Sequence, residues 1–114
     1  PKMKATVHAS KLKTMNKTGQ LKNWIIDGPL ALDNAVSQLA ARHKGIDSDV
    51  AGNVDVLVTP DINSGNILYK SLNFLGGAVS AALVLGASVP VILTSRADSD
   101  QSKFMSIVFA VAIK

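Results

Sequence analysis

Apolar residues recur every three or four positions in several stretches of the chain, a spacing that places them on one face of an α-helix. The clearest stretch runs from Leu30 to Ala40 and closes at Gly45. Thr6 stands where a helix N-cap is expected, and Gly19 stands where that first helix should end. The predicted helices span residues 7–17, 30–40, 63–75 and 99–113, and the last is apolar nearly all round.

Short runs of aliphatic and β-branched residues between these helices predict strands at residues 24–26, 55–59, 81–85 and 91–94. Only about five residues separate the last two runs, too few for a crossover helix, so they are expected to form an antiparallel hairpin. The order of elements predicts an α/β fold: a mostly parallel sheet with an antiparallel hairpin, and helices on both faces. We expect one α/β unit over residues 1–114.

The composition is that of a folded domain without disulfides. The chain has 114 residues, 47% hydrophobic and 18% charged, which excludes a disordered protein. The absence of cysteine excludes disulfides, thiolate zinc sites and cysteine nucleophiles, and it fits the expected cytoplasmic location. Residues 71–95 carry no charge and are long enough to span a bilayer, but glycines and a proline interrupt them. We therefore expect buried core rather than a membrane helix.

The net charge of +4 is unevenly distributed. The first 22 residues hold six lysines and no acid, whereas the rest holds six basic residues against eight aspartates. No arginine or aromatic residue is interleaved with these lysines, as stacking on bases would require, so we interpret the segment as a solvated face and expect no nucleic-acid partner. The chain starts at Pro1 without a signal peptide, and we expect it to be cut from a longer protein.

Polar residues follow three of the predicted strands, where ligands collect in open α/β sheets. At the last of these exits Arg96, one of two arginines, precedes a helix whose N-terminal N–H groups favour anions. This pattern points to a phosphate or carboxylate site. The alternative is that Asp98 or Asp100 caps the helix and Arg96 pairs with that acid.

The exit after Pro60 has two interpretations as well. Gly65 lets the backbone approach a ligand, with Asn66 or Ser64 as a donor; alternatively, Asn63 or Ser64 simply caps a helix. Neither a Walker motif nor a dinucleotide fingerprint is present, and no serine-hydrolase elbow occurs. The two histidines stand away from these exits, so no metal site is expected.

Three stretches in order resemble the phosphate acetyl/butyryltransferase family: IDGPLALDNA (26–35), AGNVDVLVTPD with GNILYK (51–61 and 65–70), and PVILTSRADS (90–99). The resemblance runs from about residue 24 onward and is closer to the butyryl branch in its last motif. In the family this region is the C-terminal part of a two-domain α/β enzyme, similar in architecture to isocitrate and isopropylmalate dehydrogenases. The resemblance therefore implies a missing N-terminal part and a homo-oligomer.

The resemblance also implies a reaction. A butyryl or related short-chain acyl group would move between coenzyme A and inorganic phosphate, by direct attack of the coenzyme A thiolate on an acyl phosphate. Coenzyme A is then a substrate, and no permanently bound cofactor is expected. A base helps to form the thiolate, and a positive group steadies the phosphoryl charge.

The motif matches imply the site residues. The expected catalytic residues are Ser95, Arg96 and Asp100. The expected substrate-binding residues are Asp61, Gly65, Asn66, Thr94, Asp27, Gly28 and Pro29. The chain departs from the acetyl branch twice: the position of that branch's acid is Ser102 here, and the position of its arginine is Phe74. An aromatic residue there suits a larger apolar acyl group or reflects a change in packing.

Two other classes of function remain open. One is a non-catalytic α/β module that binds phosphate or self-associates. The other is a dehydrogenase of similar two-domain architecture, which the absent nicotinamide fingerprint disfavours.

Overall fold

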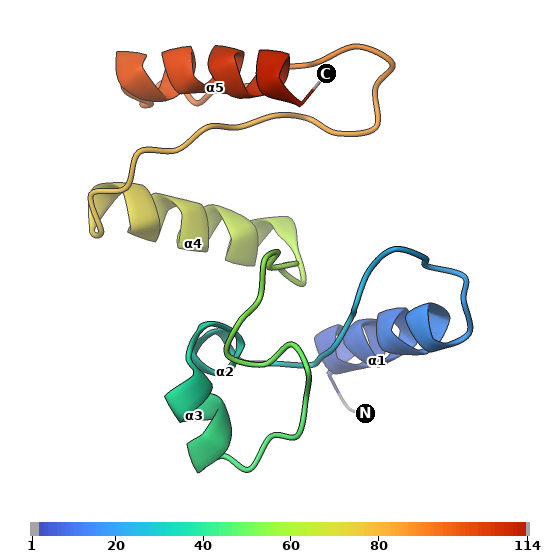
Figure 1. Cartoon of the computed structure of the whole chain (residues 1–114). Helices are drawn as coiled ribbons and strands as arrows, with labels where there is room; N and C mark the ends of the chain where they lie inside the picture. The colour runs from blue at the N-terminus through green and yellow to red at the C-terminus, as the bar shows by residue number, and fades with distance from the viewer. Residues whose placement is uncertain (1–2, 114) are drawn as a thin grey trace. The chain divides into compact units, whose positions relative to one another are not determined.

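The computed structural model describes residues 3–113 and contains five helices in that range (Figure 1). These are α1 (Lys4–Lys17), α2 (Leu32–Val36), α3 (Gln38–His43), α4 (Ile62–Phe74) and α5 (Asp100–Ala112). The chain divides into two compact units, residues 1–62 and 63–114.

The predicted α/β class is wrong. Within residues 3–113 the only strand pairing is an isolated antiparallel bridge between Val84 and Val91, so there is no sheet. The runs at 24–26 and 55–59 form no ladder, and Val58 is 79% exposed. A strand needs a hydrogen-bonded neighbour as well as an aliphatic sequence, and no described segment provides one here. Of the antiparallel hairpin predicted for residues 81–85 and 91–94, the structure contains only the bridge between Val84 and Val91.

In the first unit, the helix predicted over residues 30–40 is two helices, α2 and α3, because Ser37 interrupts it. Ser37 has extended backbone angles, and its hydroxyl oxygen accepts a hydrogen bond from the Ala40 N–H at 3.3 Å. It is therefore the N-cap of α3, in keeping with the tendency of serine to leave helix interiors for caps. The buried residues of this unit include Ala35, Ala41 and Asn34.

The helix α4 begins at Ile62, the last residue of the first unit, so the predicted caps Asn63 and Ser64 lie in its first turn instead. The chain then runs without helix from residue 78 to residue 94 beside α4 and α5 (Figure 1). Two hydrogen bonds place it there: Asn73 on α4 donates to Ser80, and the Ala82 N–H donates to Ser106 on α5. The last helix follows its prediction closely.

Of the helices within residues 3–113, none has the length and apolar character needed to cross a bilayer. The uncharged stretch 71–95 is helical only as far as Phe74. The prediction that this stretch is buried core is not met, because Leu75, Leu85 and Val89 are exposed.

Ser106 joins α5 to the neighbouring extended segment. Its side chain is 1% exposed; the hydroxyl donates to the Ser102 carbonyl at 2.8 Å and accepts from the Ala82 N–H at 3.0 Å. Ala82 is partly buried, and a backbone N–H that is shielded from water needs an acceptor, which the Ser106 hydroxyl provides.

We expect Ser106→Ala to lower the free energy of unfolding by about 1–3 kcal/mol, because the Ala82 N–H loses its acceptor. Urea unfolding of the full-length protein measures this, and Ser88→Ala, at an exposed serine of the same unit, is the matched control. Equal stability of the two variants would contradict this function of Ser106.

Candidate functional site

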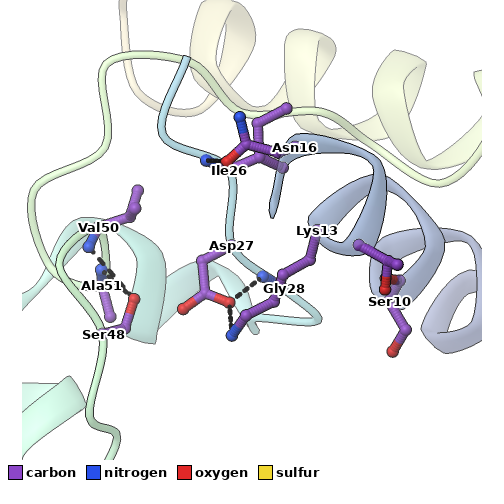
Figure 2. A network of polar contacts seen from close by, with 10 residues as sticks. Ser10, Lys13, Asn16, Ile26, Asp27, Gly28, Ser48, Val50 and Ala51 are labelled. Atoms are coloured by element: carbon purple, nitrogen blue, oxygen red, sulfur yellow. Dashed lines mark hydrogen bonds and ion pairs between the residues drawn. The ribbon is translucent and has the colours of Figure 1, made fainter. Parts of the chain in front are cut away.

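Asp27 is the centre of a polar cluster in the first unit, formed by Lys13, Asp27, Gly28 and Ser48 and called here the Asp27 cluster (Figure 2). The Asp27 carboxylate forms an ion pair with Lys13 on α1, accepts the Gly28 N–H at 2.7 Å, and accepts a hydrogen bond from Ser48. The Asp27 side chain is only 12% exposed. The carboxylate therefore fastens the turn at residues 27–29 to α1 and to the loop that contains Ser48.

Ser48 and Asn16 complete this arrangement. The Ser48 hydroxyl oxygen accepts the N–H groups of Val50 and Ala51, each at 3.2 Å, which leaves its proton to donate to Asp27. Asn16 on α1 donates to the Trp24 carbonyl. It also accepts the Ile26 N–H (Figure 2). The segment before Asp27 is thus also held to α1.

Burial by itself raises the pKa of Asp27. The hydrogen bonds from Lys13, Ser48 and Gly28, together with the positive charge of Lys13, lower it by more, so the pKa lies below its ordinary value. The carboxylate is ionised at neutral pH and bound on several sides. We infer that it shapes the turn and does not serve as a proton acceptor.

The second cluster holds the turn before α5 against α4, within the second unit. It consists of Tyr69, Lys70, Ser95 and Asp98 and is called the Asp98 cluster. One Asp98 oxygen accepts the Tyr69 hydroxyl at 2.6 Å, and the other accepts the Ser95 N–H at 2.6 Å. Lys70 donates to the Ser95 hydroxyl oxygen at 3.2 Å. Two side chains of α4 therefore position the turn that contains Ser95 and Arg96.

The hydrogen bond from Tyr69 is the main cause that lowers the pKa of Asp98. Burial opposes it, while the Ser95 N–H and the charges of Lys70 and Lys103 lower the pKa further. The hydrogen bonds continue behind Tyr69: Ser80 donates to the Tyr69 hydroxyl oxygen at 3.4 Å, and Asn73 donates to Ser80 at 3.2 Å. Each donor in this series points toward the carboxylate, which is the arrangement that stabilises an ionised Asp98.

Beside this cluster lies a shallow, open hollow of about 230 Å³. Its walls come from the end of α4 and from the start of α5, with residues 97–99 between them. The lining includes Asn73, Phe74, Asp98 and Ser102. Phe74 and Ser102 are the two positions where the chain departs from the acetyl branch, and the structure places both on this hollow.

Arg96 is exposed on the turn, next to residues that line the hollow, but it does not line the hollow itself. Across residues 3–113 it forms no ion pair. The alternative that Arg96 pairs with a helix-capping aspartate is therefore wrong. Ser99 is the N-cap of α5, accepting the Ser102 N–H at 3.1 Å, and Asp98 instead accepts from Ser95.

The other predicted site residues lie in separate places. Asp100 is the first residue of α5; its side chain is fully exposed and 3.3 Å from the Lys103 ammonium. Gly65 and Asn66 lie in the first turns of α4 rather than in a ligand-binding loop, and Asp61 directly precedes that helix. Thr94 adjoins Ser95 by sequence. Asp27, Gly28 and Pro29 belong to the first unit, so the structure does not join them to the Asp98 cluster.

Sequence reasoning missed Tyr69 and Lys70 as members of the site. The signal is present: Asn66, Tyr69, Lys70 and Asn73 are spaced three and four residues apart, which places polar side chains along one face of α4. The helix was predicted from its apolar face alone, and that pattern assigns no role to the polar face. In the part of the chain that the structure describes, no group of histidines and acids is arranged to hold a metal ion.

Comparison with known proteins gives a family model, "Phosphate acetyl/butaryl transferase", that matches residues 1–111. The chain is 58% identical over 111 residues to a probable phosphate butyryltransferase of Bacillus subtilis, covering 97% of this chain and 37% of that protein. It is 58% identical over 107 residues to the phosphate acetyltransferase of Thermotoga maritima, covering 94% and 36%.

A solved structure, that of a branched-chain phosphotransacylase from Enterococcus faecalis, is similar as well. Its TM-score is 0.81 at 41% identity, covering 97% of this chain and 40% of that one. The chain thus spans between a third and two-fifths of the length of these relatives.

The lowered pKa of Asp27 links stability to pH. Its contribution is present above the ordinary aspartate pKa and is lost as the pH falls through the lowered folded value. We expect Asp27→Asn to lower the free energy of unfolding by about 1.5–3 kcal/mol at pH 7. This deficit should begin to shrink below about pH 4, where the aspartate of the unfolded chain takes up a proton, and should be lost once the pH falls through the lowered pKa of the folded state.

Urea unfolding at pH 7 and at pH 3 measures both values, with Asp49→Asn, in the exposed part of the same unit, as the control. A deficit of the same size at both pH values would contradict the ionised, hydrogen-bonded state of Asp27.

Proposed function

Because the chain belongs to the phosphate acetyl/butaryl transferase family, we propose that its protein transfers an acyl group between coenzyme A and inorganic phosphate. The names of the relatives support this reaction. The observation that carries the proposal is the state of Arg96. Two aspartates lie within four residues of it, yet one is bound by Tyr69 and Ser95 and the other by Lys103, which leaves the guanidinium for a substrate anion.

In the proposed reaction the coenzyme A thiolate attacks the carbonyl carbon of an acyl phosphate. A bond forms between the carbonyl carbon and the sulfur. The bond between that carbon and the oxygen that bridges to phosphorus breaks, and inorganic phosphate leaves with the electron pair of that bond. Arg96 binds the phosphate end, where its planar donors match two phosphate oxygens. Ser95, next to it, donates a hydrogen bond to the reacting centre as charge develops there.

The base that accepts the thiol proton is proposed to be Asp100. Both oxygens of Asp98 already accept hydrogen bonds, and its lowered pKa makes it a weak base. Asp100 is the remaining acid of this segment, with an exposed side chain at the start of α5.

Thr94, Asp61, Gly65 and Asn66 are proposed as further contacts of the substrate. Asp27, Gly28 and Pro29 are proposed to shape its binding wall through their backbone. Glycine is favoured at position 28 because its φ is +151° and an added Cβ would lie 3.3 Å from the Ala9 side chain, so the shape of this turn depends on it.

A short-chain acyl group such as butyryl is proposed as the group that is transferred. Phe74 supports an apolar acyl chain, because this aromatic residue is among those that line the hollow beside the Asp98 cluster. The relatives include both butyryl and acetyl enzymes at 58% identity, so the hollow supplies the reason to favour the longer chain.

We expect Arg96→Ala to reduce acyl phosphate formation from butyryl-CoA and phosphate by at least about 100-fold in the full-length protein, the usual cost of removing a charge-stabilising donor from a transition state. Initial rates of coenzyme A release measure it.

Arg42→Ala, which removes the other arginine from the exposed face of α3, is the matched control and should leave the rate unchanged. An Arg96→Ala rate within about threefold of wild type would overturn the role of Arg96.

A further inference from the structure

Lys70 is the one basic side chain of the Asp98 cluster, and the structure fixes where its ammonium lies. Its Nζ is 5.2 Å from the centre of the Tyr69 ring and 5.4 Å from the centre of the Phe74 ring. Both distances are within the range of cation–π attraction. Tyr69, Lys70 and Phe74 all belong to α4, so a single helix holds the cation and its aromatic surroundings together.

The partner of Lys70 is held equally firmly. The Ser95 backbone N–H donates to Asp98, and the Asp98 carboxylate accepts the hydroxyl of Tyr69, the residue before Lys70. One carboxylate thus fixes the Ser95 backbone relative to the turn of α4 that carries Lys70. The contact of 3.2 Å between Nζ and the Ser95 hydroxyl oxygen follows from this arrangement.

The orientation of the Ser95 hydroxyl can then be worked out from its hydrogen bonds. A serine hydroxyl has one proton to donate and two lone pairs that accept. An ammonium can only donate, so Lys70 occupies one lone pair, and the Ala97 N–H, 3.4 Å away, occupies the other. The proton is left directed away from both donors.

We propose that Lys70 is a positioning residue that sets the rotor of the Ser95 hydroxyl, so that its proton donates to the substrate. Lys70 acts through Ser95 and is not itself assigned a contact with phosphate. A donor that already has the right orientation needs no reorganisation as charge develops on the substrate, which is the advantage of a preorganised site.

The same hydrogen bonds exclude another role for Ser95. A nucleophilic serine must pass its proton to a neighbouring base, and an ammonium donating to its oxygen is the opposite arrangement. The inference rests on the proposed function for the identity of the substrate. It adds a second residue to the reaction and predicts an energetic coupling between the two.

The test is a double-mutant cycle in the full-length protein, with kcat and the KM for phosphate measured for each variant. The variants are Lys70→Met, Ser95→Ala and the two together, with Lys44→Met as a control at an exposed lysine. We expect Ser95→Ala to lower kcat about 100-fold and Lys70→Met about tenfold, with the KM for phosphate unchanged. In the Ser95→Ala background, Lys70→Met should cost no more than about twofold.

Lys70→Arg keeps a hydrogen-bond donor at this position and should retain part of the kcat that Lys70→Met loses. It also provides a test if Lys70→Met does not fold. Equal losses from Lys70→Met with and without Ser95 would overturn the inference, as would a raised KM for phosphate in the Lys70 variants. Absence of acyl transfer by the wild type would overturn the proposed function and the inference with it. A normal kcat for Ser95→Ala in an active wild type would overturn the inference alone.

Discussion

The Asp98 carboxylate is the interaction on which the proposed site depends. It joins the Tyr69 hydroxyl of α4 to the Ser95 backbone just before α5, with both oxygens at hydrogen-bonding distance. Without it, the turn with Ser95 and Arg96 would lack its fixed position relative to α4. Each oxygen of this carboxylate accepts a hydrogen bond from within the chain, no ion pair joins it to Arg96 in the described residues, and the guanidinium is exposed. Asp98 thus holds the turn in place through its hydrogen bonds, and the Arg96 guanidinium beside it stays available for an anionic ligand.

The Asp27 cluster follows the same principle in the other unit. There the Asp27 carboxylate binds a lysine and a hydroxyl from other parts of the chain, whereas Asp98 binds a hydroxyl and a backbone N–H, and in both cases the hydrogen bonds lower the pKa of the carboxyl. In both clusters a serine oxygen accepts hydrogen bonds from two donors, so its own proton is directed away from them. The Ser48 proton is donated to Asp27. The Ser95 proton is proposed to be donated to a substrate. The two serines thus differ in the acceptor of that proton: it is a carboxylate of the same chain for Ser48 and a substrate in the proposal for Ser95.

The sequence predicted the helices better than the sheet. The last helix was placed to within a residue or two, since Ser99 caps it and its apolar residues are continuous. The sheet was wrong because aliphatic runs such as 55–59 identify strands only if a neighbouring segment completes the ladder, and composition says nothing of that neighbour. The turn with Ser95 and Arg96 was found from its sequence motif. Its anchors Tyr69 and Lys70 were missed, because their spacing marks only a polar face of α4 and their partners Asp98 and Ser95 lie more than twenty residues further along the chain.

The most direct test of the central claim is the kcat/KM for phosphate of Asp98→Asn in the full-length protein, compared with wild type at neutral pH. An asparagine of the same shape turns one acceptor into a donor and removes the charge, so one of the two bonds that hold the turn is lost. The account predicts a fall of at least about tenfold while the protein stays folded. A value within about threefold of wild type would contradict it, because the position of Arg96 would then not depend on this carboxylate.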